Sequence, residues 1–147
     1  MVKKAAENKE QEEKLRGLAV IINSILAPLN DNIRFQKEFK NTDARILLNA
    51  PNLNNAVIII IFHGSLKVKS IPNKPKTNIK KKNIGWNVFI EFDTQTLFTL
   101  AISKLSLLKI AKLWISRKIK IRGIRNLLLL LKMLNILTQN SEFKIRN

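Results

Sequence analysis

The chain has 147 residues and a formal net charge of +17, with 27 Lys and Arg against 10 Asp and Glu and no cysteine. Its length suits one domain with one core, and an apolar fraction of 46% is enough to form that core. The lack of cysteine excludes disulfides, thiolate metal sites and thiol nucleophiles. The charge favours nucleic acid, anionic lipid headgroups or an acidic protein as a partner, although an Ile-, Lys- and Asn-rich compositional bias would also produce it.

The two ends of the chain predict a cytoplasmic protein that is at most peripheral at membranes. Residues 1–14 are charged, are expected to form a helical extension, and lack the apolar region and cleavage site of a secretory signal. No window holds the roughly 20 apolar residues that a membrane span needs. The last residues lack a Ser-Lys-Leu type peroxisomal signal. We therefore expect one domain over residues 15–140 and a tail at 141–147.

The first part of the domain predicts two helices. From Leu15 onward, apolar residues recur with the i, i+3, i+4 spacing of a one-faced helix, which Pro28 is expected to end. Asn30 or Asp31 is expected to cap a second, short helix over residues 32–40, because either side chain can accept from free backbone amides.

The middle of the chain predicts a sheet. The turn at Gly64 predicts a hairpin, and a Lys- and Pro-rich segment without periodicity, residues 72–83, predicts an exposed loop. Phe89 breaks an otherwise regular alternation of apolar and polar residues in the strand that follows this loop. Alternating or β-branched runs predict four strands, over residues 44–50, 56–62, 65–71 and 86–92.

The last third predicts three helices and one more strand. Asp93 is expected to cap a helix over residues 94–105, and Ser106 is expected to cap the helix after it. Residues 117–122 alternate basic and apolar side chains, as an edge strand does, and Gly123 permits a sharp turn into the final helix. That helix is apolar around most of its circumference, which is more than one contact with a sheet would bury.

This order of elements resembles the sterol carrier protein domain family, over about residues 15 to 138. In that family, glycine usually precedes both the short helix and the basic strand, whereas this sequence has Ser106 and Arg117 there. The swap to Ser106 keeps a capping residue. The segments that carry the resemblance are IIIIFHGSLKV (58–68), FIEFDTQTLFTLAISKL (89–105) and SLLKIAKLWISRKIKIRGIRNLLLLLKML (106–134).

The resemblance implies an α+β fold with a five-stranded, mostly antiparallel sheet, covered by about five helices that enclose an apolar tunnel. It also implies that the domain binds and transfers a hydrophobic ligand, such as a sterol, a fatty acyl chain, or an isoprenoid or phospholipid chain. A Leu or Phe at helical spacing nevertheless belongs to an ordinary core far more often than to a ligand wall. The expected lipid-lining residues are Leu97, Phe98, Ala101, Ile102, Ile110, Trp114, Leu128, Leu131 and Leu134.

The sequence is compatible with three kinds of macromolecular partner. The basic loop is expected to dock on an anionic membrane, although it is also explained as a merely solvated segment. A nucleic-acid-binding protein is the alternative, but the few aromatics do not interleave with the loop and no recognition motif is present, so no specific nucleic acid is expected. A protein partner, contacted by the charged N-terminal helix, is a third hypothesis. The expected membrane-docking residues are Lys74, Lys76, Lys80, Lys81 and Lys82.

The sequence predicts a binding protein and not an enzyme. Its one imidazole, His63, lies beside the turn glycine, where a structural role is expected. Asp93 is expected to act as a helix cap and not as a general base. No phosphate-binding glycine loop or P-loop lysine is present, and no metal or cofactor is expected.

Overall fold

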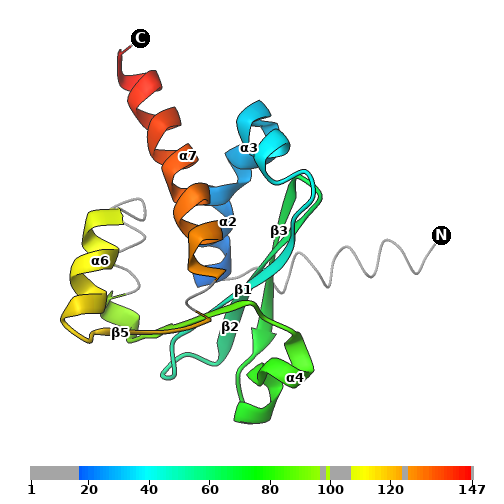
Figure 1. Cartoon of the computed structure of the whole chain (residues 1–147). Coiled ribbons are helices and arrows are strands. Elements are labelled where there is room, and N and C mark those ends of the chain that lie inside the picture. The colour runs from blue at the N-terminus through cyan, green and yellow to red at the C-terminus, as the bar shows by residue number, and fades with distance from the viewer. Residues whose placement is uncertain (1–16, 97–98, 100–106, 124–125, 147) are drawn as a thin grey trace.

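The computed structural model describes residues 17–96, 99, 107–123 and 126–146. In this part of the chain a five-stranded sheet carries helices on both faces (Figure 1). The strand order is β3-β2-β1-β4-β5, and neighbouring strands are antiparallel except for the parallel pair β1 and β4. The predicted α+β class and mostly antiparallel, five-stranded sheet are therefore confirmed. The strands are β1 (Asp43–Asn49), β2 (Asn55–Phe62), β3 (Ser65–Pro72), β4 (Val88–Phe92) and β5 (Ile119–Arg122).

The helices form two unequal layers. α2, α3 and α7 lie on the upper face of the sheet in Figure 1, and α4 lies beneath it, while α6 stands beside β5. Among the described residues, no helix combines the length and apolar character needed to cross a membrane. The helices are α2 (Leu18–Leu26), η1 (Ala27–Asp31), α3 (Ile33–Glu38), η2 (Lys76–Ile79), α4 (Lys81–Ile84), α6 (Leu107–Ile115) and α7 (Leu127–Arg146), of which η1 and η2 are 3-10 helices.

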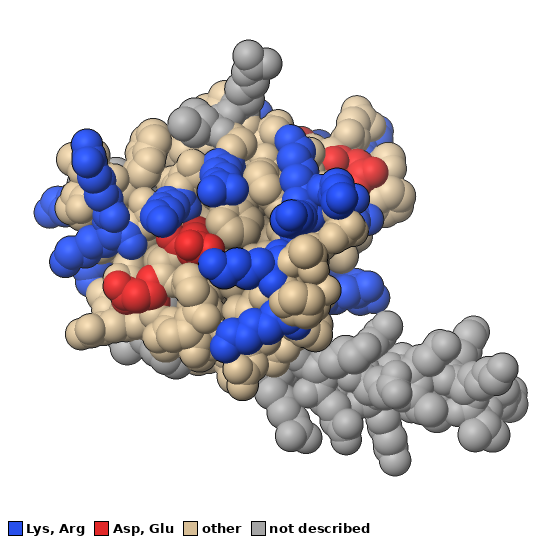
Figure 2. All heavy atoms as spheres, turned by 90° about the horizontal axis from the view of Figure 1, so that it is seen from below, with Lys and Arg blue, Asp and Glu red and all other residues tan. Residues whose placement is uncertain are grey.

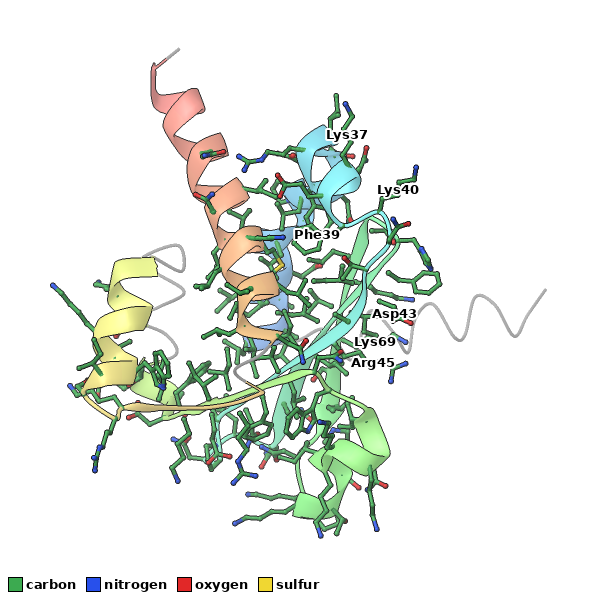
Figure 3. All side chains as sticks on the ribbon, in the orientation of Figure 1. Lys37, Phe39, Lys40, Asp43, Arg45 and Lys69 are labelled. Atoms are coloured by element: carbon green, nitrogen blue, oxygen red, sulfur yellow. The ribbon has the colours of Figure 1, made fainter. Side chains whose placement is uncertain are left out.

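The larger core lies between the sheet and the upper helices. Alternate side chains of every strand point into it, as the period of two in a strand requires. Phe35 and Phe39 are buried there, with their rings stacked at a centroid distance of 4.7 Å. Figure 3 shows Phe39 among the side chains beside α7, whereas Lys37 and Lys40 lie on the outer side of this layer. The apolar periodicity of α2 and α3 thus serves this core.

A smaller core lies on the lower face of the sheet. Leu47 and Phe89 project from the strands and pack against Ile79 and Trp86, which come from the Lys-rich segment and its end. Residues 72–83 are mostly exposed, as the sequence predicts, but they are not an irregular loop, because Ile79 packs on the sheet and the short helices η2 and α4 form along the segment. Phe89, the exception to the alternation in β4, faces this second core.

The cap of α3 differs from the prediction. Asn32 accepts a hydrogen bond from the backbone N–H of Phe35 at 2.9 Å, which makes it the N-cap. Asn30 instead pairs with the backbone of Leu66, accepting from its N–H at 2.7 Å and donating to its carbonyl at 3.0 Å. The prediction of Asn30 or Asp31 as the cap is wrong, because Asn30 joins η1 to β3.

The turn before β5 contains Arg117, which has a φ of 60°. A Cβ in this left-handed conformation costs roughly 1–2 kcal/mol, so glycine is favoured at such positions. The N–H of Arg117 donates to the carbonyl of Trp114 at 3.1 Å, and that of Lys118 donates to Leu113 at 2.9 Å. Arg117 therefore provides the turn that a glycine would provide, and these bonds close the end of α6.

Asp93 caps the helical turn at residues 94–96, as predicted. Its carboxylate accepts from the backbone N–H of Thr96 at 2.6 Å, and this hydrogen bond lowers the pKa of Asp93 below its ordinary value of 3.8. A lowered folded-state pKa means that the carboxylate stabilises the fold above the unfolded pKa, and that this contribution is lost as the pH falls through the folded value.

We expect Asp93→Asn to lower Tm by a constant amount between about pH 5 and pH 8, because asparagine keeps an acceptor but loses the charge. The difference in Tm should begin to shrink below about pH 4, where the carboxylate of the unfolded state takes up a proton, and should be lost once the native carboxylate is protonated as well. Thermal unfolding of the variant and the parent, followed by circular dichroism across this pH range, measures the difference in Tm. A difference that stays unchanged down to about pH 2 would show that the charge of Asp93 does not stabilise the helix start.

Candidate functional site

A pocket of about 760 Å³ opens on the lower face of the sheet, beside the smaller core. Figure 2, which views the molecule from below, shows Lys and Arg side chains gathered on this face. The pocket is lined by seven cationic side chains and one carboxylate, that of Glu91. We call it the basic pocket. Its cations are Lys74, Lys76, Lys80, Lys81, Lys82, Lys120 and Arg122.

Two aromatic rings form part of the floor of the basic pocket. The centroids of Trp86 and Phe89 are 5.4 Å apart, and each side chain is only 8% exposed. The Nζ of Lys81 lies 5.4 Å from the Trp86 ring centroid, and the Cζ of Arg122 lies 5.8 Å from that of Phe89, within the range of cation–π attraction. The rings therefore hold two cations in place and leave no open face for stacking.

The Lys-rich wall of the basic pocket is held by side-chain hydrogen bonds. The amide nitrogen of Asn73 donates to the Asn49 side-chain oxygen at 3.0 Å and to the Leu53 carbonyl at 2.9 Å. The indole N–H of Trp86 donates to the carbonyl of Ile79 at 3.1 Å. The buried Asn73 therefore fixes the start of the segment to β1 and the β1–β2 turn, and Trp86, just after the segment, fixes its end to Ile79.

Few negative charges lie near the cations of the basic pocket. Glu91 accepts from the amide of Asn49 at 3.1 Å, and it is the cross-strand neighbour of Lys120. Within the described residues the one ion pair within 4.0 Å joins Arg34 to Glu38, away from the pocket. The pocket is thus a concave surface of strongly positive potential.

Positive charge continues around the β5 edge. A smaller hollow of about 290 Å³ is lined by Arg117, Lys118 and Lys120 together with Glu91 and Asp93. It shares Lys120 and Glu91 with the basic pocket, so the two hollows adjoin each other. The basic surface therefore extends from the underside of the sheet to the C-terminal end of α6.

Apolar side chains are exposed on the helices above and beside this edge. On α6, Trp114 is exposed and Ile115 has 80% of its surface accessible to solvent. On α7, which contacts α6, Leu128 is 65% exposed and Leu131 is also exposed. These exposed apolar groups on two adjoining helices are candidate contacts for an apolar ligand.

The predicted lipid-lining residues fall into three groups. Trp114, Leu128 and Leu131 are exposed, whereas Leu134 is 2% exposed and belongs to the larger core. The side chain of Ile110, on α6, is not among the described ones. The cavity wall therefore stays a prediction. Outside the described residues lie Leu97, Phe98, Ala101 and Ile102.

The predicted docking lysines all lie at the basic pocket, together with two further cations that were not among the predicted docking residues, Lys120 and Arg122. The fold also brings Trp86 and Phe89 to these lysines, although the sequence places no aromatic among them. Three apolar residues within or next to a Lys-rich run, Ile79, Ile84 and Trp86, were the signal that this run packs on a sheet.

His63 and Asp93, the residues that could have served in catalysis, both take part in structural hydrogen bonds. The Nδ1 of His63 lies 3.1 Å from the carbonyl oxygen of Lys40, at the β2–β3 turn. Asp93 caps a helix. Within the described part of the chain, no three His, Asp or Glu side chains gather as a metal site would require.

Comparison with solved structures supports the fold. No family model matches the sequence, and no curated protein does. Among solved structures, the ubiquinone synthesis protein UbiJ-SCP2 superposes with a TM-score of 0.55 at 10% identity, over 80% of this chain and 88% of that one. A conserved hypothetical protein of Thermus thermophilus, suggested to be a sterol carrier protein, superposes with a TM-score of 0.53 at 13% identity, over 82% of each chain. This chain has a sterol carrier protein-like fold.

The sterol carrier protein-like fold confirms the resemblance that the sequence shows. The likeness covers most of both solved structures, and so concerns the whole domain and not one motif. At these low identities it is a likeness of fold. What this sterol carrier protein-like domain binds has to be argued from its own residues.

Proposed function

We propose that this sterol carrier protein-like domain binds a hydrophobic lipid against the exposed apolar side chains of the helices α6 and α7, as a binding protein and not an enzyme. The observation that supports this proposal most is the exposure of large apolar side chains, such as Ile115 and Leu128, on those two helices. A sterol, fatty acyl, isoprenoid or phospholipid chain would bury them, at a gain of roughly 25 cal/mol for each Å² removed from water. The structural positions of His63 and Asp93 favour binding over catalysis.

The proposed mechanism begins at an anionic membrane. The basic surface runs from the basic pocket through Lys120 to Arg117 and Lys118, and it ends next to Trp114 and Ile115. Cations that contact headgroups contribute on the order of 1 kcal/mol each, and a tryptophan beside them suits the membrane interface. This arrangement would bring the end of α6 to the bilayer, from which the lipid enters. A cytoplasmic, peripheral location is part of this proposal.

Native mass spectrometry of the purified protein, followed by organic extraction, tests lipid binding directly. The expected result is a co-purified lipid at a ratio near one to one, whose identity gives the ligand class. Added palmitic acid or cholesterol should then raise Tm if the lipid has been removed, because a ligand that binds only the folded state stabilises it. A protein that carries no lipid and gains no stability from either probe contradicts the proposal.

The chain offers a reporter for each surface, since it has two tryptophans. The variant Trp86→Phe retains Trp114, whose emission should shift to shorter wavelength when palmitic acid or anionic vesicles bind, because the exposed indole becomes buried. Trp114→Phe retains the buried Trp86, which should not respond to palmitic acid. A response from Trp86 and none from Trp114 would contradict the placement of the lipid site at α6.

A further inference from the structure

We propose that the basic pocket is a binding site for a compact polyanion that carries two or more phosphate groups, either a lipid headgroup or a soluble phosphate ester. The inference deepens the docking part of the proposed function, because it names the chemistry that the lysines recognise. It does not depend on lipid binding at α6 and α7, which lie outside the lining of this pocket.

The pocket draws its cations from two walls that are far apart in the sequence. The register of β4 and β5 pairs Phe89 with Arg122 and Glu91 with Lys120, so both cations of β5 project from the lower face. Residues 74–82, within the Lys-rich segment, supply the other five cations from the facing side. Like charges collected in one concavity repel one another. An anion placed between them is attracted to each cation, and this attraction offsets the repulsion.

The kind of anion follows from the charges and the volume. Seven cations against one carboxylate leave a surplus that a single monoanion does not neutralise, whereas each phosphomonoester carries nearly two negative charges. Lysine ammonium groups bind phosphate as point charges, and Arg122 adds a planar guanidinium that can bind two oxygens. The volume, about 760 Å³, lies within the range of small-molecule sites.

Contacts within the protein hold the walls of the pocket. Hydrogen bonds of Asn73 and Trp86 hold the Lys-rich segment, and the Nη1 of Arg45 donates to the carbonyl of Ile84 at 2.7 Å, which ties the end of α4 to β1. Arg122 is held over the ring of Phe89. A wall that is already ordered loses less conformational entropy on binding than a free lysine-rich loop would lose.

Single-stranded nucleic acid fits this pocket less well. Its usual sites combine a basic groove with open aromatic faces on which bases stack. Here the rings of Trp86 and Phe89 are 8% exposed and each has a cation over it. A compact polyanion uses those cations where they are, whereas a stacked base would have to displace them.

The test uses the full chain with Trp114→Phe, in which Trp86 reports on the pocket. Fluorescence titration with inorganic tripolyphosphate should give a saturable, one-to-one change, and inorganic phosphate should bind much more weakly. Adding Lys81→Ala and Lys120→Ala, one from each wall, should weaken binding roughly 25-fold, about fivefold for each charge. Both side chains are exposed, so the fold should persist, which circular dichroism checks.

The matched control is Lys37→Ala with Lys40→Ala in the same background. It removes the same charge from exposed positions near α3, away from α4 and the basic pocket (Figure 3). We expect this control to bind tripolyphosphate as the parent does at moderate salt. Equal losses in the two double variants would mean that net charge alone is sensed, which would overturn the pocket. Tighter binding of oligo-dT than of tripolyphosphate at the same salt concentration would also overturn it.

Two further arms separate the sources of phosphate. Soluble inositol trisphosphate and vesicles that contain phosphatidylinositol bisphosphate should both bind and should compete, whereas phosphatidylglycerol vesicles of equal surface charge should bind more weakly. If vesicles of both kinds bind equally and no soluble anion binds, membrane docking stands and the pocket fails. If soluble anions bind but no vesicle does, the pocket stands, with a free phosphate ester as its ligand, and the docking proposal fails.

Discussion

Gly123→Ala is expected to destabilise the fold by about 3–5 kcal/mol, which is a large part of the stability of a domain of this size. Gly123 has a φ of +80°, and a Cβ placed on it would lie 2.1 Å from the carbonyl oxygen of Asn87. That oxygen belongs to the backbone of the residue just before β4, so it cannot move aside as a flexible side chain could. β5 would have to separate from β4, with loss of their hydrogen bonds. Urea unfolding measures the loss.

Gly85→Ala is the control for this prediction. Gly85 has a similar φ of +69°, but a Cβ there would meet no atom within 4 Å. Alanine at this position should therefore cost only the left-handed backbone conformation, roughly 1–2 kcal/mol. The difference between the two variants isolates the close approach of Gly123 to Asn87. Equal losses in both would show that backbone conformation alone accounts for the effect.

The sequence predicts those parts of the fold that depend on local chemistry. The β-branched run of β2 and the alternation in β5 identify strands, because each residue there records which face is buried. Asp93 is identified as a cap because its partner is three residues away. The cap of α3 is missed because Asn30 and Asn32 are equally suitable locally, and the tertiary contact of Asn30 with Leu66 decides between them.

The basic pocket could not be predicted from the sequence, because it depends on register. Lys120 and Arg122 lie about forty residues from the Lys-rich segment, and only the pairing of β4 with β5 places them on the same face as that segment. Phe89 was the visible sign of a second buried face, since it is apolar where alternation requires a polar residue. A strand with apolar residues on both sides needs a cover on each, and here the Lys-rich segment provides the second cover.

Leu134→Ala is expected to lower the free energy of unfolding by about 2–5 kcal/mol, because it opens a cavity in the larger core. Leu134 is 2% exposed and next to Met133, which is fully buried in the same cluster. The variant should still gain stability from palmitic acid, since the proposed lipid contacts on α7 are elsewhere on that helix. Leu131→Ala, at an exposed position on α7, is the control with the same chemical change.

The two variants should therefore separate folding from binding. Leu131→Ala should change the free energy of unfolding by less than about 0.5 kcal/mol, as exposed substitutions do, and should reduce the rise in Tm that palmitic acid produces. Leu134→Ala should lower the free energy of unfolding in urea but should leave the rise in Tm with palmitic acid unchanged. If Leu134→Ala instead abolishes the lipid-dependent rise in Tm, then the lipid reaches the inner side of α7, and the cavity extends into what is here the larger core. That outcome would make Leu134 part of the lipid wall, as the resemblance to the sterol carrier protein family first implied.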